Sequence, residues 1–130
     1  MYITIDTSAI IAVIGNEATK ESIIEVTSGF SLYAPMSVHW EIGNAFSAMF
    51  KRHKFTIEQA KLALVSYREI PIKFIDVPLE QSLDLSHSLN IYSYDAYLIQ
   101  CAQQTSTSLL TLDKGLRLAG KKTGLHIIEV

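Results

Sequence analysis

The first ten residues, MYITIDTSAI, contain the pattern that most constrains this chain, because a short strand passes through a carboxylate directly into a helix. Ile3 and Ile5 alternate with other β-forming residues, as strands do. Asp6 follows at once, and Thr7 and Ser8 are able to cap the apolar helix that begins there. Ligands bind at the carboxyl ends of strands in open α/β sheets. Asp6 is therefore either a plain helix N-cap or part of a binding site at the edge of a sheet.

The rest of the chain repeats this alternation of strands and helices. The strands are expected at the N-terminus and at Phe30–Ala34, Ile72–Val77, Ser108–Leu112 and Leu125–Val130. Three helices are expected at Ala18–Thr27, Leu79–Leu89 and Asp95–Gln104, and another begins at Thr7. One long helix is expected from an N-cap at Ser37 to near Lys54, and the next from a cap at Thr56 to Glu69. The last helix begins at Lys114, and Gly120 is a candidate for its end. Alternating elements predict a three-layer α/β/α fold whose central parallel sheet has about five strands. The length suits one domain, residues 1–130.

The composition excludes several classes of protein. Hydrophobic residues make up 48% of the chain, unlike the composition of a disordered tail. The single cysteine, Cys101, excludes an internal disulfide, and no apolar run is long enough to span a bilayer. Because Met1 leads directly into the first expected strand, we expect no signal peptide and a cytoplasmic location. The net charge of -2 means that any contact with nucleic acid depends on local basic groups.

Three further carboxylates lie where strands end or helices begin. Asp113 comes directly after an expected strand, as Asp6 does, and Asp95 opens an apolar helix whose dipole stabilises negative charge. Glu41 lies early in a helix and beside its apolar stripe, where a carboxylate is unfavourable unless it is paired, hydrogen-bonded or coordinated. Glu41 is thus either a flanking residue with a Lys or Arg partner or a member of the same site as the three aspartates.

These four carboxylates are able to converge at one edge of the sheet. Carboxylates that share a pocket repel each other, and Mg²⁺ or Mn²⁺ relieves the repulsion because these cations prefer oxygen ligands. Two such ions about 3.5–4 Å apart hold the attacking and leaving oxygens of a phosphodiester. The pattern therefore predicts metal-dependent phosphodiester chemistry. The chain has no His-x-x-x-His motif and no cysteine pair, so a zinc site is not expected.

Four stretches of the chain resemble the PIN-domain nucleases, and most closely the VapC-type toxins of bacterial and archaeal toxin–antitoxin pairs. The stretches are ITIDTSAI, SVHWEIGNAF, YSYDAYLIQCA and LLTLDKGL, which follow the order of the family across essentially the whole chain. The acids of the family fall on Asp6, Glu41, Asp95 and Asp113. Its small hydroxyl residues beside the metal fall on Ser8 and Thr111.

This resemblance implies an endoribonuclease that depends on Mg²⁺ or Mn²⁺, cuts RNA and thereby halts translation. The four acids would hold the metal and carry the catalysis, and Glu41 or Asp95 would orient or deprotonate a water. Ser8 and Thr111 would orient carboxylates through their hydroxyls. VapC-type toxins are blocked by a cognate antitoxin and commonly form homodimers. The many apolar residues expected between positions 37 and 69 suit either kind of protein partner.

The basic residues and the overall function leave alternatives open. Lys114 and Arg117 lie three residues apart on one helical face and are candidates for contacts with RNA phosphates. The basic run KRHK at 51–54 is explained either by phosphate contacts or by the dipole of the helix that it ends. The alternatives to a toxin are a PIN nuclease of RNA processing and a catalytically silent PIN module that binds RNA or protein. A phospho-receiver is a more distant alternative, because receivers usually carry adjacent acids after the first strand and Asp6 stands alone.

Overall fold

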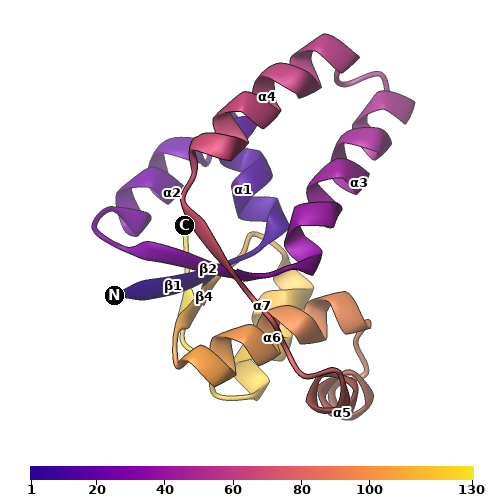
Figure 1. Ribbon diagram of the computed structural model, residues 1–130. Coiled ribbons are helices and arrows are strands. Elements are labelled where there is room, and N and C mark those ends of the chain that lie inside the picture. Colours follow the sequence, from indigo (N-terminus) through magenta and orange to yellow (C-terminus); the bar gives the residue numbers. More distant parts are fainter.

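A five-stranded parallel sheet runs through the middle of the computed structural model, which describes residues 1–130 (Figure 1). The strands are β1 (Tyr2–Ile5), β2 (Ser31–Pro35), β3 (Ile72–Ile75), β4 (Ser108–Leu110) and β5 (Ile127–Ile128). Their order across the sheet is β3-β2-β1-β4-β5, and every neighbouring pair is parallel. Ile3, Thr4 and Ile5 are all buried, so the central strand β1 is covered on both faces. This is the burial expected of a sheet that lies between two helical layers.

Seven helices form the two outer layers. The helices are α1 (Thr7–Ile14), α2 (Lys20–Thr27), α3 (Ser37–Lys51), α4 (Ile57–Glu69), α5 (Leu79–Leu89), α6 (Ser93–Thr105) and α7 (Lys114–Lys122). The first four lie on one side of the sheet, where α3 and α4 form a hairpin that projects away from it, and α5, α6 and α7 lie on the other side (Figure 1). The three-layer α/β/α prediction is therefore confirmed.

Two helices, α1 and α6, each carry a run of apolar residues that are buried in the core. In α1, Ile10 and Ala12 are fully buried, and in α6 the same is true of Ile99 and Ala102. Cys101 of α6 is also buried, and its burial raises the pKa of the thiol to about 11. This cysteine therefore belongs to the core. None of the seven helices combines the length and the apolar surface that a bilayer crossing requires.

The order in which strands are added to the sheet reverses between β1 and β4. From β1 the chain adds β2 and then β3 on one side, and it returns across the sheet to add β4 and β5 on the other. The two strands at this switch point are joined just beyond their ends, where the N–H of Asp6 donates to the carbonyl of Leu110 at 3.2 Å. Open α/β sheets bind their ligands in the crevice at such a switch point. Asp6 and Asp113 follow the two strands that border this crevice.

Three strands, β3, β4 and β5, are shorter than the sequence predicts, for reasons that lie in their neighbours, and β2 is shifted by one residue from the expected Phe30–Ala34. β3 was expected to reach Val77 but ends at Ile75, whose partner Pro35 is the last residue of β2. β4 was expected to reach Leu112 and ends two residues earlier, because the N–H of Leu112 donates to a side chain and not to a neighbouring strand. The expected last strand Leu125–Val130 shrinks to Ile127–Ile128, since only two of its residues pair with β4.

Helix ends also differ from the prediction. α3 stops at Lys51 and not near Lys54, because His53 takes a left-handed conformation with φ of 57°. Its N-cap is Met36 and not Ser37, which is the first residue of the helix. α7 continues through Gly120, where an added Cβ would lie 2.8 Å from Ile127 Cδ1. This glycine therefore brings α7 close to the sheet and does not end the helix.

The remaining helices agree with the prediction to within two residues at each end. α2 begins at Lys20 and not at Ala18, and α6 runs from Ser93 to Thr105, whereas the prediction was Asp95–Gln104. The predicted cap of α4 is present: the N–H of Gln59 donates to the Thr56 hydroxyl oxygen, and its side-chain oxygen accepts from the Thr56 N–H. This reciprocal capping starts α4 where the sequence places it.

Candidate functional site

The four carboxylates singled out in the sequence line one pocket of about 480 Å³ at the carboxyl ends of β1 and β4. Asp6 follows β1 and Asp113 follows β4, whereas Glu41 projects from α3 and Asp95 from the first turn of α6. Because the elements come from both helical layers, the pocket exists only where the layers meet at the sheet edge. We call this site the acid pocket, and its four members Asp6, Glu41, Asp95 and Asp113 are the pocket acids.

Asp6 is the most buried of these acids, with 6% of its surface exposed. Its Oδ1 accepts from the Ser8 hydroxyl at 2.7 Å and from the Ala9 N–H at 3.1 Å, and its Oδ2 accepts from the Thr111 hydroxyl. Burial raises the pKa of Asp6 although these hydrogen bonds oppose the rise, and the charge of Asp113 adds to it. Asp6 is thus the N-cap of α1 and also lines the acid pocket.

Two hydroxyls connect Asp6 to the end of β4. The Ser8 hydroxyl donates to Asp6 and accepts from the N–H of Leu112 at 3.0 Å. The Thr111 hydroxyl donates to Asp6 and accepts from the N–H of Asp113 at 3.0 Å. Thr111 is completely buried. Each hydroxyl therefore fixes the Asp6 carboxylate against the backbone that carries Asp113.

Glu41 has a partner that the sequence did not indicate. Its Oε2 accepts from the Thr7 hydroxyl at 2.6 Å, so the residue next to Asp6 orients the carboxylate of α3. Partial burial raises the pKa of Glu41, the hydrogen bond from Thr7 lowers it, and the charges of Asp6 and Asp95 raise it further. The predicted alternative, an ion pair of Glu41 with Lys or Arg, does not form, since the one salt bridge in the structure joins Lys121 to Glu129.

The other two acids stand at the N-termini of helices. Asp95 is half-buried, and desolvation followed by the charge of Asp113 raises its pKa. Asp113 is exposed and caps α7, where its Oδ1 accepts from the N–H of Leu116 at 2.9 Å. Glu17, in the turn that precedes α2, also lines the pocket. No local pattern indicates this position of Glu17, because in the sequence it resembles any solvent-facing acid of that region.

The chemistry of the donors fits a hard divalent cation. The ionisable groups that line the pocket are all carboxyl groups, and oxygen is the ligand that Mg²⁺ and Mn²⁺ prefer. No group of three or more of these side chains is placed so that it could hold a metal ion. Mg²⁺ usually keeps several waters and binds one or two carboxylates together with substrate phosphates, so the arrangement fits this mode of binding.

The two basic residues predicted to contact RNA lie beside this pocket and do not line it. Lys114 is exposed at the first position of α7, next to Asp113. Arg117 is half-buried, and its Nε donates to the carbonyl of Thr111 at 2.9 Å. The Nε edge of this guanidinium therefore holds the chain segment that carries Thr111 and Asp113.

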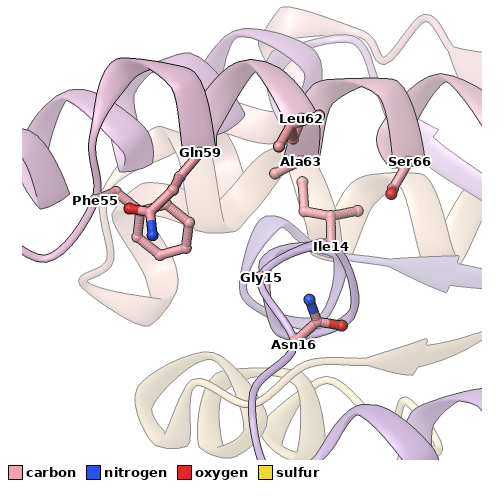
Figure 2. A pocket seen from close by; sticks show the side chains of 8 residues that line it. All are labelled: Ile14, Gly15, Asn16, Phe55, Gln59, Leu62, Ala63 and Ser66. Carbon is pink, nitrogen blue, oxygen red and sulfur yellow. The ribbon is translucent and has the colours of Figure 1, made fainter.

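A second pocket, of about 320 Å³, lies between the end of α1 and α4 and holds no carboxylate (Figure 2). Ile14 and Asn16 border it from the end of α1, and Phe55 and the α4 residues Gln59 and Leu62 border it from the other side. Leu62 is 70% exposed, and Trp40 in α3 is 69% exposed. The surplus of apolar residues predicted for this hairpin is thus present on its surface.

The raised pKa values predict how the metal-free protein responds to pH. An acid whose pKa is raised in the folded state holds its proton at pH values at which the unfolded chain has lost it, so stability falls as pH rises from about 4 through the raised values. Glu41→Gln mimics the protonated acid and keeps an acceptor for Thr7. In EDTA we expect the Tm of Glu41→Gln to exceed that of the wild type by an amount that grows from acid to neutral pH.

Thermal unfolding across this pH range measures the difference. The control is Glu80→Gln, an exposed carboxylate of α5 outside the pocket, which should stay within about 2 °C of the wild type throughout. A Tm difference for Glu41→Gln that shrinks toward neutral pH would contradict the electrostatic account of the pocket.

Comparison with known proteins identifies related sequences and folds. The family model described as PIN domain matches residues 3–122. No curated protein matches the chain. Among solved structures, the chain resembles PAE2754 from Pyrobaculum aerophilum, with 20% identity and a TM-score of 0.65 over 93% of this chain and 89% of that one.

Two further structures have the same fold. VapBC2 from Rickettsia felis, bound to a DNA fragment from their promoter, matches with 16% identity and a TM-score of 0.71 over 98% of both chains. A domain of a functionally unknown protein from Methanocaldococcus jannaschii matches with 21% identity and a TM-score of 0.57 over 99% of this chain and 91% of that one. At these identities the structures show a shared fold.

Proposed function

This chain belongs to the PIN domain family, and on that premise we propose that it is a metal-dependent endoribonuclease that hydrolyses RNA phosphodiester bonds. PIN domains are generally nucleases. The observation that carries the proposal is the convergence of all four pocket acids on one open pocket at the switch point of the sheet. A pocket of carboxylates alone repels a phosphodiester, so the reaction requires a cation to bring the two together.

The pocket acids would hold Mg²⁺ or Mn²⁺, which supplies charge neutralisation at the phosphate and lowers the pKa of a bound water. Asp6 is fixed by three hydrogen bonds and is the most rigid of the four. Its task is to set the position of the cation. Rigid placement matters because the metal must meet the scissile phosphate in one geometry.

Glu41 and Asp95 are the two candidates for the group that orients the attacking water and accepts its proton. Both have a raised pKa, and a general base works best when its pKa is close to the operating pH. Glu41 is turned into position by the Thr7 hydroxyl, and Asp95 stands in the first turn of α6, where the helix dipole stabilises its charge. Lys114, exposed beside Asp113, would steer phosphates toward the pocket, with Arg117 beside it.

We further propose that the protein is the toxin of a toxin–antitoxin pair, acts in the cytoplasm, and inhibits translation by cutting RNA. The likeness to VapBC2 from Rickettsia felis supports this proposal. A cognate antitoxin, a homodimer, or both would cover exposed apolar residues of the α3–α4 hairpin, among them Ile57, Leu62 and Val65. The alternatives are a PIN nuclease of RNA processing and a PIN module that binds RNA or protein without cutting.

The test is cleavage of purified transfer RNA, ribosomal RNA and a DNA of matched sequence in Mg²⁺, in Mn²⁺ and in EDTA. We expect RNA to be cut only with metal, and Asp95→Asn to slow cleavage by about 100-fold through loss of a charged group beside the reacting phosphate. The control is Asp84→Asn, which removes an exposed carboxylate of α5 and should leave the rate unchanged.

Metal uptake, measured by calorimetry, separates the alternatives. A protein that neither cuts RNA nor takes up Mn²⁺ would contradict the catalytic proposal and support a binding module. Cleavage of DNA in preference to RNA would contradict the proposal that the substrate is RNA.

A further inference from the structure

Two exposed aromatic side chains stand next to the pocket acids. Trp40 is 69% exposed and precedes Glu41 on α3, and Tyr94 is 58% exposed and precedes Asp95 on α6. Large aromatic side chains are usually buried, because they dominate the apolar area that a fold removes from water. Their exposure on both helices that supply acids, each one residue from an acid, calls for an explanation.

The two rings border a single pocket that continues the acid pocket. This third pocket, of about 590 Å³, is lined by Trp40 and Tyr94 together with Ser37 and Asn44. It also includes Glu41 and Ala45, and both of these line the acid pocket as well. A ligand chain that crosses the acid pocket is therefore able to continue between the two rings. We call Trp40 and Tyr94 the aromatic shelf.

Each ring of the aromatic shelf is held by an aromatic neighbour. Trp40 meets His39 edge-on, with ring centroids 4.8 Å apart, and the Nδ1 of His39 lies 2.8 Å from the Tyr67 hydroxyl. Tyr94 meets Tyr97 in the same manner at 5.8 Å. Such edge contacts restrict the rotamers of exposed rings, which lowers the entropy lost when a flat ligand binds.

We propose that the aromatic shelf stacks an unpaired nucleobase of the RNA substrate, on the nucleotide next to the phosphate held in the acid pocket. The inference rests on the proposed nuclease function. The charge of the lining favours a base over a phosphate, because its one ionisable acid is Glu41 and it contains no Lys or Arg. Base–aromatic stacking contributes about 1–3 kcal/mol per base and needs no cation.

The polar residues of the lining suit the edge of a base. The Oγ of Ser37 is the one buried side-chain nitrogen or oxygen that has no hydrogen-bond partner, and the exposed Asn44, about two turns further along α3, lines the same pocket. A buried hydroxyl without a partner is destabilising by about 1–3 kcal/mol, and a base edge offers both donors and acceptors. Stacking requires a base that is free of pairing, so the substrate class is single-stranded or looped RNA.

The test uses Trp40 itself, because it is the only tryptophan of the chain. Asp95→Asn protein, which cuts slowly, is titrated in Mg²⁺ with a fluorescein-labelled single-stranded RNA of twelve nucleotides, and binding is followed by anisotropy and by tryptophan emission. We expect the RNA to quench Trp40, and the added change Tyr94→Ala to weaken binding about tenfold. The control is Tyr92→Ala, which removes a more exposed tyrosine, 88% exposed, that does not line the shelf pocket, and should change binding less than twofold.

Three results would overturn the proposal. RNA that binds without changing the emission of Trp40 does not stack on it. Equal losses of RNA affinity in Tyr94→Ala and Tyr92→Ala would mean that the aromatic shelf does not bind the RNA. A blue shift of Trp40 that depends on protein concentration, together with a dimer in sedimentation, would make the shelf a protein interface.

Cleavage by the wild-type protein, measured in parallel, keeps this proposal separate from the nuclease function. Cleavage with no quenching would overturn the aromatic shelf alone. Quenching with no cleavage would contradict the nuclease and leave the base-binding site in place.

Discussion

Asp6→Asn is expected to slow metal-dependent RNA cleavage by about 1,000-fold while the protein remains folded. The carboxylate is the most buried of the pocket acids, and its loss removes about 4 kcal/mol of the interactions that place the cation at the phosphate. The fold tolerates the change, because the amide oxygen still accepts from Ser8 and Ala9, and Thr111 is able to accept from the amide nitrogen. The measurement is single-turnover cleavage at saturating protein.

The stability of the same variant provides the control. Asp6→Asn removes a buried charge that is repelled by Asp113, so in EDTA at neutral pH its Tm should equal or exceed that of the wild type. Addition of Mg²⁺ should stabilise the wild type and leave the variant unchanged, because the ion binds the native site of one protein and not of the other. Full activity in the variant would show that Asp6 has no role in placing the cation, and a collapse of its Tm would show that Asp6 is needed for the fold.

Thr111→Val is expected to have the largest effect on stability among substitutions in the site. Valine fills the same volume, but it deprives the buried Asp6 carboxylate of a donor and the N–H of Asp113 of an acceptor. Losing a hydrogen bond to a charged group and leaving a second group unpaired should lower the free energy of unfolding by about 2–4 kcal/mol at pH 7. Urea unfolding at fixed ionic strength measures this value.

Two comparisons test the cause of that loss. Thr111→Ser keeps the hydroxyl and should lose about 1 kcal/mol, for the missing methyl group. The difference in the free energy of unfolding between Thr111→Val and the wild type should shrink as the pH falls below the raised pKa of Asp6, because a protonated carboxyl group depends less on an external donor. An equal loss of stability in Thr111→Val and Thr111→Ser would show that the effect comes from packing and not from the hydroxyl group.

Much of this architecture follows from local patterns. A strand that passes through a carboxylate into a helix predicts the position of Asp6, and the same pattern predicts Asp113, because the chain direction alone sends both to one sheet edge. Asp95 follows from the N-terminus of a helix that is apolar on most sides. The family match over residues 3–122 agrees with the resemblance that the four stretches carry.

Other features depend on contacts between distant segments and have no local signature. The hydrogen bond of Thr7 to Glu41 requires α1 to pack against α3, and the sequence around Thr7 indicates only a helix start. β4 ends early because Leu112 binds Ser8, a residue far away in the chain. Glu17 reaches the pocket through the path of the turn after α1, which propensity does not specify.

The pairing of β1 with β4 has a consequence for when the activity first appears. Residues 3–5 pair with residues 108–110, and Asp113 lies beyond them, so the pocket is incomplete until residues 1–113 have all been made. Contacts of such sequence separation form late in folding. A chain that stops before Asp113 therefore lacks the acid pocket, and with it the proposed nuclease activity.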